Sequence, residues 1–174
     1  MNTVFIADDE LIIRQGIKCI IDWEQLGFEI IGEASNGEDA LNFILNKHPD
    51  LVLMDIRMPK MLGLDVVEAA RNKGFNGKVI ILSGYTDFKY AQAAIKNGVD
   101  YYLTKPIDED ELYETVDSIR SQISKEAEDK ETLSTYRDKA KSMILFDILT
   151  GSFSNILVFC IKYCFFIFFV IPII

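Results

Sequence analysis

Residues 49–59 read PDLVLMDIRMP, and they indicate the fold more directly than any other stretch. Four apolar residues, 51–54, lie between a turn former, Pro49-Asp50, and a single carboxylate, Asp55. A short apolar run with such boundaries is typical of a strand that is buried on both faces of a parallel sheet. Ligands of such sheets bind just beyond the carboxyl ends of the strands, so Asp55 is expected at a binding crevice.

The same strand signal recurs along the chain and alternates with helical periodicity. Short apolar runs predict four further strands at residues 4–7, 28–34, 79–82 and 99–103. Helical spacing predicts helices at residues 11–21, 38–45, 64–70, 88–95 and from Asp108 onward. Five strands that alternate with five helices predict an α/β fold, a doubly wound five-stranded parallel sheet with a C-terminal helical extension.

Composition limits the classes of protein to which the chain can belong. It has 174 residues, 49% of them hydrophobic, which is enough for a packed core. Its net charge of −9 argues against binding nucleic acid by bulk charge, which needs clustered Lys and Arg. Three cysteines (Cys19, Cys160 and Cys164) without a disulfide-framework spacing fit a reducing compartment, and no signal peptide opens the chain. We therefore expect a cytoplasmic protein.

Polar residues follow four of the five predicted strands. Asp8 and Asp9 follow the first strand, Asp55 the third, Ser83 the fourth and Lys105 the fifth. Because the carboxyl ends of parallel strands meet at one edge, these side chains should converge. Clustered carboxylates repel one another and need a cation, and oxygen ligands without Cys or His favour Mg²⁺ over Zn²⁺.

Such a site suits a phosphoryl group. A metal and a lysine neutralise its oxygens, a hydroxyl donates a hydrogen bond, and aspartate is a known type of phosphoryl acceptor. Taken singly, each residue has an ordinary explanation: an aspartate after a strand usually caps the next helix, and Lys105 alone would be a solvated lysine. Only their conjunction is improbable by chance.

Four segments in order carry a family resemblance: IADDE (6–10), LMDIRMP (53–59), LSG (82–84) and LTKP (103–106). Residues 1–120 resemble the receiver domain of two-component response regulators. DWEQLGFEIIGEASNGEDAL and SGYTDFKYAQAAIKNGVDYYLTKPID resemble the subfamily with a C-terminal AraC-type helix-turn-helix domain. One departure is Leu62 before Gly63, where the family often has Asp, so the loop after Asp55 is expected to differ slightly.

The resemblance implies a flavodoxin-like receiver fold and a set of roles. Asp55 would accept a phosphoryl group from a sensor histidine kinase. Asp9 and Asp55 would bind Mg²⁺ by side chain, Arg57 by its carbonyl and Asp8 through water. Ser83 and Lys105 would contact the phosphoryl oxygens.

The resemblance also implies a switch and an output. Tyr102 would be the aromatic switch that follows Ser83, and Lys105-Pro106 would be a cis peptide. The chain would act in a phosphorelay that normally controls transcription, with a homodimer possible on phosphorylation. It would be no enzyme beyond self-phosphorylation from small donors and autodephosphorylation, and it would reach DNA only through an output domain that this chain lacks.

Two other functions are weighed against this one. A stand-alone or membrane-tethered receiver would act by protein contacts alone. A Mg²⁺-dependent phosphohydrolase of the haloacid dehalogenase type would want a second acid two residues after Asp55, where this chain has Arg57.

We divide the chain into a receiver at 1–121, a helical linker at 122–150 and an apolar tail at 151–174. The linker either leads to an output region or pairs with a second copy, and a plain solvated helix explains it equally well. The tail holds one charged residue, Lys162, in the run ILVFCIKYCFFIFFVIPII (156–174). We favour a frameshifted or truncated gene product over a genuine membrane anchor.

Overall fold

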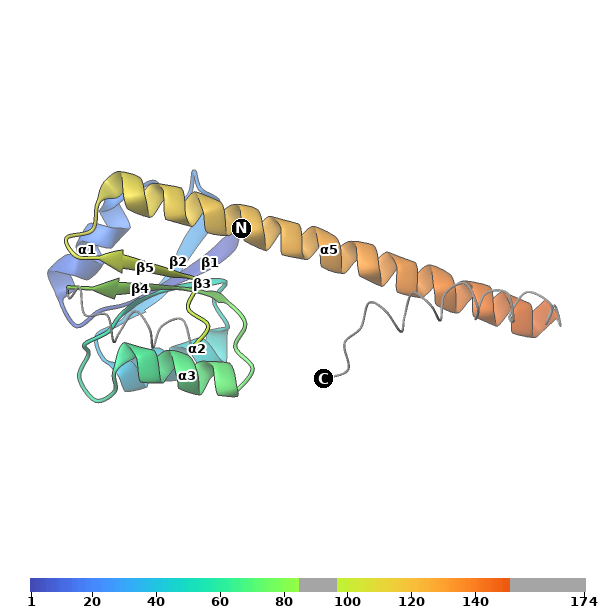
Figure 1. Ribbon diagram of the computed structural model, residues 1–174, viewed down its shortest axis with the longest axis horizontal. Helices are drawn as coiled ribbons and strands as arrows, with labels where there is room; N and C mark the ends of the chain where they lie inside the picture. The colour runs from blue at the N-terminus through green and yellow to red at the C-terminus, as the bar shows by residue number, and fades with distance from the viewer. Residues whose placement is uncertain (85–96, 151–174) are drawn as a thin grey trace. The chain divides into compact units, whose positions relative to one another are not determined.

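The computed structural model describes residues 1–84 and 97–150, with side chains as far as Phe146. Five parallel strands form one sheet in the order β2-β1-β3-β4-β5 (Figure 1). This order reverses direction between β1 and β3, as expected for a doubly wound sheet, and a ligand crevice lies at such a reversal. The fold class predicted from the sequence is confirmed. The helix predicted at 88–95 and the tail at 151–174 lie outside the described residues.

The elements lie close to their predicted ranges. The strands are β1 (Asn2–Ala7), β2 (Phe28–Ala34), β3 (Leu51–Asp55), β4 (Lys78–Ser83) and β5 (Tyr101–Thr104). The helices are α1 (Leu11–Ile20), α2 (Gly37–Lys47), α3 (Gly63–Asn72) and α5 (Glu109–Thr150). Polar side chains set two of the helix starts, because Asn36 accepts a hydrogen bond from the Asp39 N–H (3.0 Å) and Asp108 accepts one from the Glu111 N–H (3.0 Å).

One strand starts later than the sequence predicts. β5 begins at Tyr101 instead of residue 99. The carboxylate of Asp100 accepts a hydrogen bond from the Val79 N–H (2.8 Å), and the Asp100 N–H donates to the Val79 carbonyl (3.0 Å). A side chain therefore takes up a backbone donor at the start of β4, and regular pairing between the strands starts one residue further along.

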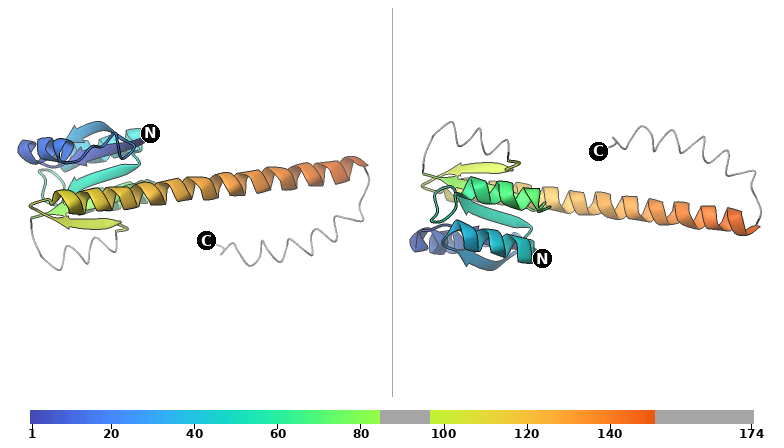
Figure 2. Two further views of the ribbon diagram at one scale, coloured as in Figure 1. Left: turned by 90° about the horizontal axis from the view of Figure 1, so that it is seen from above. Right: turned by 90° about the horizontal axis from the view of Figure 1, so that it is seen from below.

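The sheet is buried on both faces because successive side chains in each strand point to opposite sides. In β3, Val52 and Met54 belong to the core cluster beneath α2 and α3, whereas Leu51 and Leu53 belong to the cluster beneath α1 and the first part of α5. Figure 1 shows these two helical layers on either side of the strands, and the view from below in Figure 2 places α2 and α3 in front of the sheet. The strands read as continuous apolar runs for this reason.

The chain divides into two compact units, Met1–Ile123 and Ser124–Ile174. In the first, α5 contributes the buried residues Leu112, Val116 and Ile119 to the core. In the second, the described side chains from Ser124 to Phe146 are exposed apart from half-buried Ala140. Within residues 1–84 and 97–150, we find no helix with the length and apolar character that a membrane span requires.

Candidate functional site

A crevice of about 220 Å³ lies beyond the carboxyl ends of the strands. The loops that follow β1, β3, β4 and β5 all contribute to it. Its lining residues are Asp9, Glu10, Asp55, Ile56, Arg57, Ser83, Gly84 and Lys105. The topology therefore brings together residues that lie up to 96 positions apart in the sequence.

The ammonium group of Lys105 joins the two buried carboxylates of the site. Its Nζ lies 2.7 Å from Asp8 Oδ2 and 2.6 Å from Asp55 Oδ1. Asp8 is fully buried and Asp55 is 5% exposed, so water can screen neither pair effectively. One cation thus balances two carboxylates that come from different strands.

Backbone contacts fix the orientation of Asp55. The Arg57 N–H donates to Asp55 Oδ2 (2.6 Å), so the two carboxylate oxygens have different partners. Gly63, the first residue of α3, packs directly against the Asp55 carbonyl, and its N–H donates to the Ile56 carbonyl (2.9 Å). A side chain at position 63 would collide with the backbone of Asp55, which explains the glycine at this close approach.

Burial and neighbouring charges have opposite effects on the pKa values of Asp55 and Lys105. Burial raises the pKa of the Asp55 carboxyl above its ordinary value, although the Lys105 ammonium and the Arg57 N–H favour the charged form. Burial also disfavours the Lys105 ammonium, but its contacts with Asp55 and Asp8 outweigh this and hold the pKa of Lys105 above its ordinary value. The Lys105 side chain therefore stays cationic at neutral pH.

The acidic loop after β1 brings three carboxylate groups close together. Carboxylate oxygens of Asp8, Asp9 and Glu10 all lie within 4.8 Å of one another, close enough to share one ion. The Glu10 N–H donates to Asp8 Oδ1 (3.0 Å), which holds the loop compact. A donor set made only of oxygens fits Mg²⁺, so the residues present suit this ion.

This cluster differs from the ligand set expected from the sequence. Glu10 is not a member of that expected set, although it directly follows Asp8-Asp9, and this adjacency is the signal that could have found it. Asp55 and Arg57, which are members, line the same crevice. Asp55 Oδ1 is paired with the Lys105 ammonium, a contact that the expected ligand set did not include.

The remaining predicted residues surround the crevice from β4 and β5. Ser83 is buried at the end of β4, and its carbonyl accepts a hydrogen bond from the Lys105 N–H (2.7 Å). The Lys105–Pro106 peptide bond is cis. Tyr102 is half-buried in β5, where it packs against the core cluster beneath α2 and α3, and it does not line the crevice.

Residues 4–117 match the response regulator receiver domain family. The chain belongs to this family. Among curated proteins, this receiver is 37% identical over 126 residues to the transcriptional regulatory protein YesN of Bacillus subtilis, covering 72% of the chain and 34% of YesN. It is 45% identical over 112 residues to the transcriptional regulatory protein HptR of Staphylococcus aureus, covering 64% of the chain and 44% of HptR. The chain thus spans less than half the length of these relatives.

Solved structures place the receiver in the same family. The REC domain of AraT, a response regulator from Geobacillus stearothermophilus, is 42% identical with a TM-score of 0.69, covering 72% of this chain and 98% of that one. A DNA-binding response regulator of the LuxR family from Staphylococcus aureus is 35% identical with a TM-score of 0.61, covering 69% and 99%. Receivers of this family are phosphoacceptors in two-component signalling, and they interact with histidine kinases.

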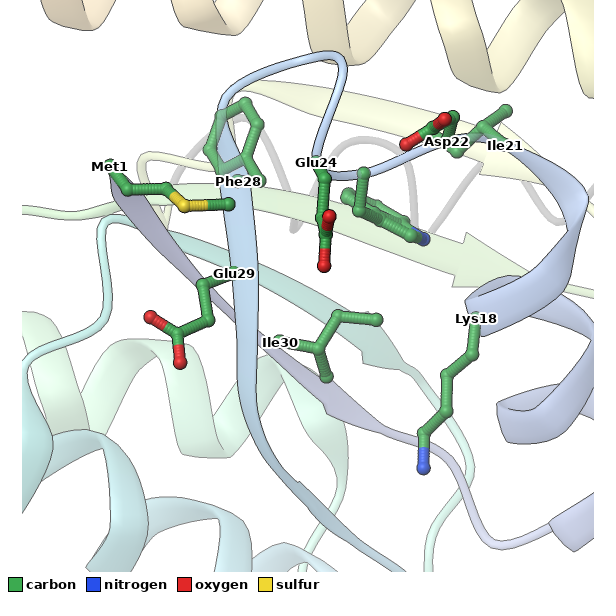
Figure 3. Close-up of a pocket in the computed structure, with 9 residues that line it drawn as sticks. Met1, Lys18, Ile21, Asp22, Glu24, Phe28, Glu29 and Ile30 are labelled. Carbon is green, nitrogen blue, oxygen red and sulfur yellow. The ribbon is translucent and has the colours of Figure 1, made fainter.

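A second and larger cavity, about 520 Å³, lies beside the edge strand β2 (Figure 3). Its walls mix apolar side chains such as Met1, Phe28 and Ile30 with acids such as Glu29. The one lysine that lines it, Lys18, is engaged by Glu33 at 2.6 Å. Among the described residues no cluster of metal-ligating side chains borders this cavity. The acidic cluster and the Lys105 bridge both lie at the crevice beyond the strand ends instead.

Proposed function

We propose that Asp55 accepts a phosphoryl group from a sensor histidine kinase and that the chain relays this signal in the control of transcription. One observation carries the proposal: Lys105 bridges Asp55 and Asp8 inside a crevice that Asp9 and Glu10 also border. This arrangement sets a carboxylate nucleophile beside a fixed cation and a set of oxygen ligands. These are the groups that phosphoryl transfer requires.

The contacts of Asp55 suggest which oxygen reacts. Both oxygens have a partner at 2.6 Å, but Oδ2 is held by a backbone N–H and Oδ1 by the side chain of Lys105, which can move; Oδ1 is therefore the oxygen that would attack phosphorus. As its bond to phosphorus forms and the donor's bond breaks, the Lys105 ammonium would shift from Oδ1 to a phosphoryl oxygen. Asp9, Asp55 and the Arg57 carbonyl would hold Mg²⁺, with Asp8 and Glu10 nearby, and the bound ion would supply positive charge to the site.

Ser83 and Tyr102 would convert the new anion into a change of surface. Ser83, at the end of β4, would move its hydroxyl toward the phosphoryl group, and half-buried Tyr102 in β5 would adjust to the space that it leaves. The face formed by β5 and α5 would then bind a second copy. The names of YesN and HptR support transcription as the output, through a DNA-binding region of the whole regulator, and the setting would be cytoplasmic.

The test is phosphorylation with acetyl phosphate and Mg²⁺, with the labelled residue located by mass spectrometry. The wild-type chain should carry the label on Asp55, and Asp55→Asn should carry none in that peptide. Asp65→Asn, an exposed acid of α3, is the matched control and should be labelled like wild type. Wild-type labelling of that same peptide in Asp55→Asn would refute the assignment. Steady release of phosphate from small phosphomonoesters would instead indicate a phosphohydrolase.

A further inference from the structure

One buried cation beside the crevice has no role in the chemistry described above. Arg14 of α1 is 8% exposed, although its side chain carries a charge. Its Nη1 donates to the carbonyl of Asp8 (2.8 Å) and to that of Asp9 (3.4 Å). Its Nε lies 3.6 Å from Glu33 Oε2 on β2. The guanidinium thus touches the backbone of the acidic loop and not its carboxylates.

All three carbonyls of the acidic loop face residue 14. The Glu10 carbonyl accepts a hydrogen bond from the Arg14 N–H (3.2 Å), beside the two carbonyls that bind Nη1. At the loop's start, the Asp8 N–H donates to the Ala34 carbonyl (3.1 Å). Because each peptide unit is planar, a fixed carbonyl also fixes the orientation of the peptide from which the neighbouring side chains project. The contacts of Arg14 therefore restrain the two peptide units that follow Asp8 and Asp9.

Arg14 could affect the binding of a cation in two ways, by its charge or by orienting the acidic loop, and the surrounding charges make these two effects distinguishable. Glu33 Oε2 lies 2.6 Å from Lys18 Nζ and 3.6 Å from Arg14 Nε, so one acid is shared by two cations. A net positive charge consequently remains next to the acidic loop. If charge alone mattered, removing Arg14 would strengthen the binding of a divalent cation. If Arg14 orients the loop, removing it would weaken that binding.

We propose that Arg14 is a positioning residue for the cation site: its planar guanidinium, with Nε beside Glu33, holds Nη1 against the carbonyls of Asp8 and Asp9 so that their carboxylates converge on one ion. This inference rests on the proposed function of the crevice and adds a residue that touches neither the ion nor the phosphoryl group. A guanidinium presents several donors in a fixed plane, whereas a lysine ammonium is a point charge on a flexible stem. Arg14→Lys should therefore keep the charge and lose the positioning.

The experiment measures the affinity of the full chain for Mg²⁺ by calorimetric titration, with folding of each variant checked by circular dichroism. We expect Arg14→Gln and Arg14→Lys each to bind Mg²⁺ about tenfold more weakly than wild type, the order seen when groups that orient metal ligands are removed. Lys18→Gln removes a neighbouring charge without touching the loop, and it should bind Mg²⁺ at least as tightly as wild type.

Arg71 provides a matched control for general destabilisation. Its guanidinium also binds carbonyls, those of Phe75, Gly77 and Gly98 (2.8–2.9 Å), none of which lines the crevice. Arg71→Gln should lower the melting temperature and leave the Mg²⁺ affinity unchanged. A melting temperature lowered equally by Arg14→Gln, without loss of affinity, would reduce Arg14 to a structural role.

The outcomes separate this inference from the proposed function. Wild-type affinity in Arg14→Lys, or tighter binding in Arg14→Gln, would overturn the positioning role while the wild-type site stands. If Arg14→Gln does not fold, Arg14→Lys alone decides between the two effects. A wild-type chain that binds no Mg²⁺ at millimolar concentration would overturn the proposed function, and this inference with it.

Discussion

The same substitution at two glycines should change the stability of this receiver in opposite directions. Gly63 opens α3, and an added Cβ would meet the Asp55 carbonyl oxygen at a distance that real atoms do not reach, with Met54 Cγ at 2.9 Å. Gly16 lies in the exposed interior of α1, and a Cβ there would meet nothing within 4 Å. The two variants carry the same substitution, so any difference in their stability reflects the surroundings of the added methyl group.

The magnitudes follow from these surroundings. Overpacking costs about 1–3 kcal/mol, and the cost of Gly63→Ala should lie at the upper end because the obstacle is backbone and cannot rotate away. The gain in helix propensity, up to about 1 kcal/mol, offsets part of it. We expect Gly63→Ala to lose roughly 2 kcal/mol and Gly16→Ala to gain about 0.5–1 kcal/mol, since alanine restricts the unfolded chain without strain.

Urea denaturation of both variants and of wild type measures these differences, and thermal melting should separate the two variants by roughly 10 °C. Because the displaced backbone belongs to Asp55, Gly63→Ala should also slow labelling by acetyl phosphate, whereas Gly16→Ala should not. A Gly63→Ala chain as stable as wild type would refute the argument that the close approach of α3 to β3 requires a glycine.

Further expectations concern the ion, the switch, acid stability and the tail. Mg²⁺ at millimolar concentration should raise the melting temperature of the wild-type chain, and Asp9→Ala should lose most of this shift; an equal shift in the variant would exclude Asp9 as a ligand. Ser83→Ala should still be phosphorylated but should no longer dimerise in response, and unchanged phosphate-dependent dimerisation on a sizing column would count against Ser83 as the coupling residue. The ion pair with Lys18 holds the pKa of Glu33 below its ordinary value, so its stabilisation is present above that value and is lost as pH falls through the folded-state pKa. Glu33→Gln should therefore flatten the acid limb of a stability–pH curve, and an unaltered limb would show that the pair contributes nothing. Deleting 152–174 should raise solubility and leave the melting temperature unchanged; a loss of folding on deletion would mean that the tail belongs to the core.

The sequence predicts the architecture well because strands that are buried on both faces of a doubly wound sheet consist of continuous apolar runs. The predicted strand 28–34 coincides with β2, and 51–54 lacks only the terminal Asp55 of β3. The predicted start of β5 is wrong by two residues because Asp100 uses its carboxylate to bind the Val79 N–H. A contact between residues 21 positions apart has no local signature in the sequence.

Convergence of the site is predictable in the same way, since topology alone brings the strand ends together. The pattern of ion pairs within the site cannot be predicted from the sequence. Nothing in the sequence indicates that Lys105 bridges Asp8 and Asp55, whereas Glu10 could have been found from its position directly after Asp8-Asp9. The role of Arg14 is equally hidden, because in sequence it is one basic residue of an amphipathic helix, and its partners are backbone carbonyls that carry no residue identity.

Among the described residues, the buried core of the receiver ends well before the end of the chain, and this has an evolutionary consequence. The buried members of both described core clusters come from residues 4–119, the last being Ile119 in the fourth turn of α5. Recombination after Ile123, the last residue that packs against these clusters, would exchange the C-terminal part of a regulator and leave the described receiver core intact. Selection can therefore act on the receiver and on its attachments separately, so one signal-accepting unit can be reused with many different outputs. The relatives, of which this chain covers less than half, fit such a modular history.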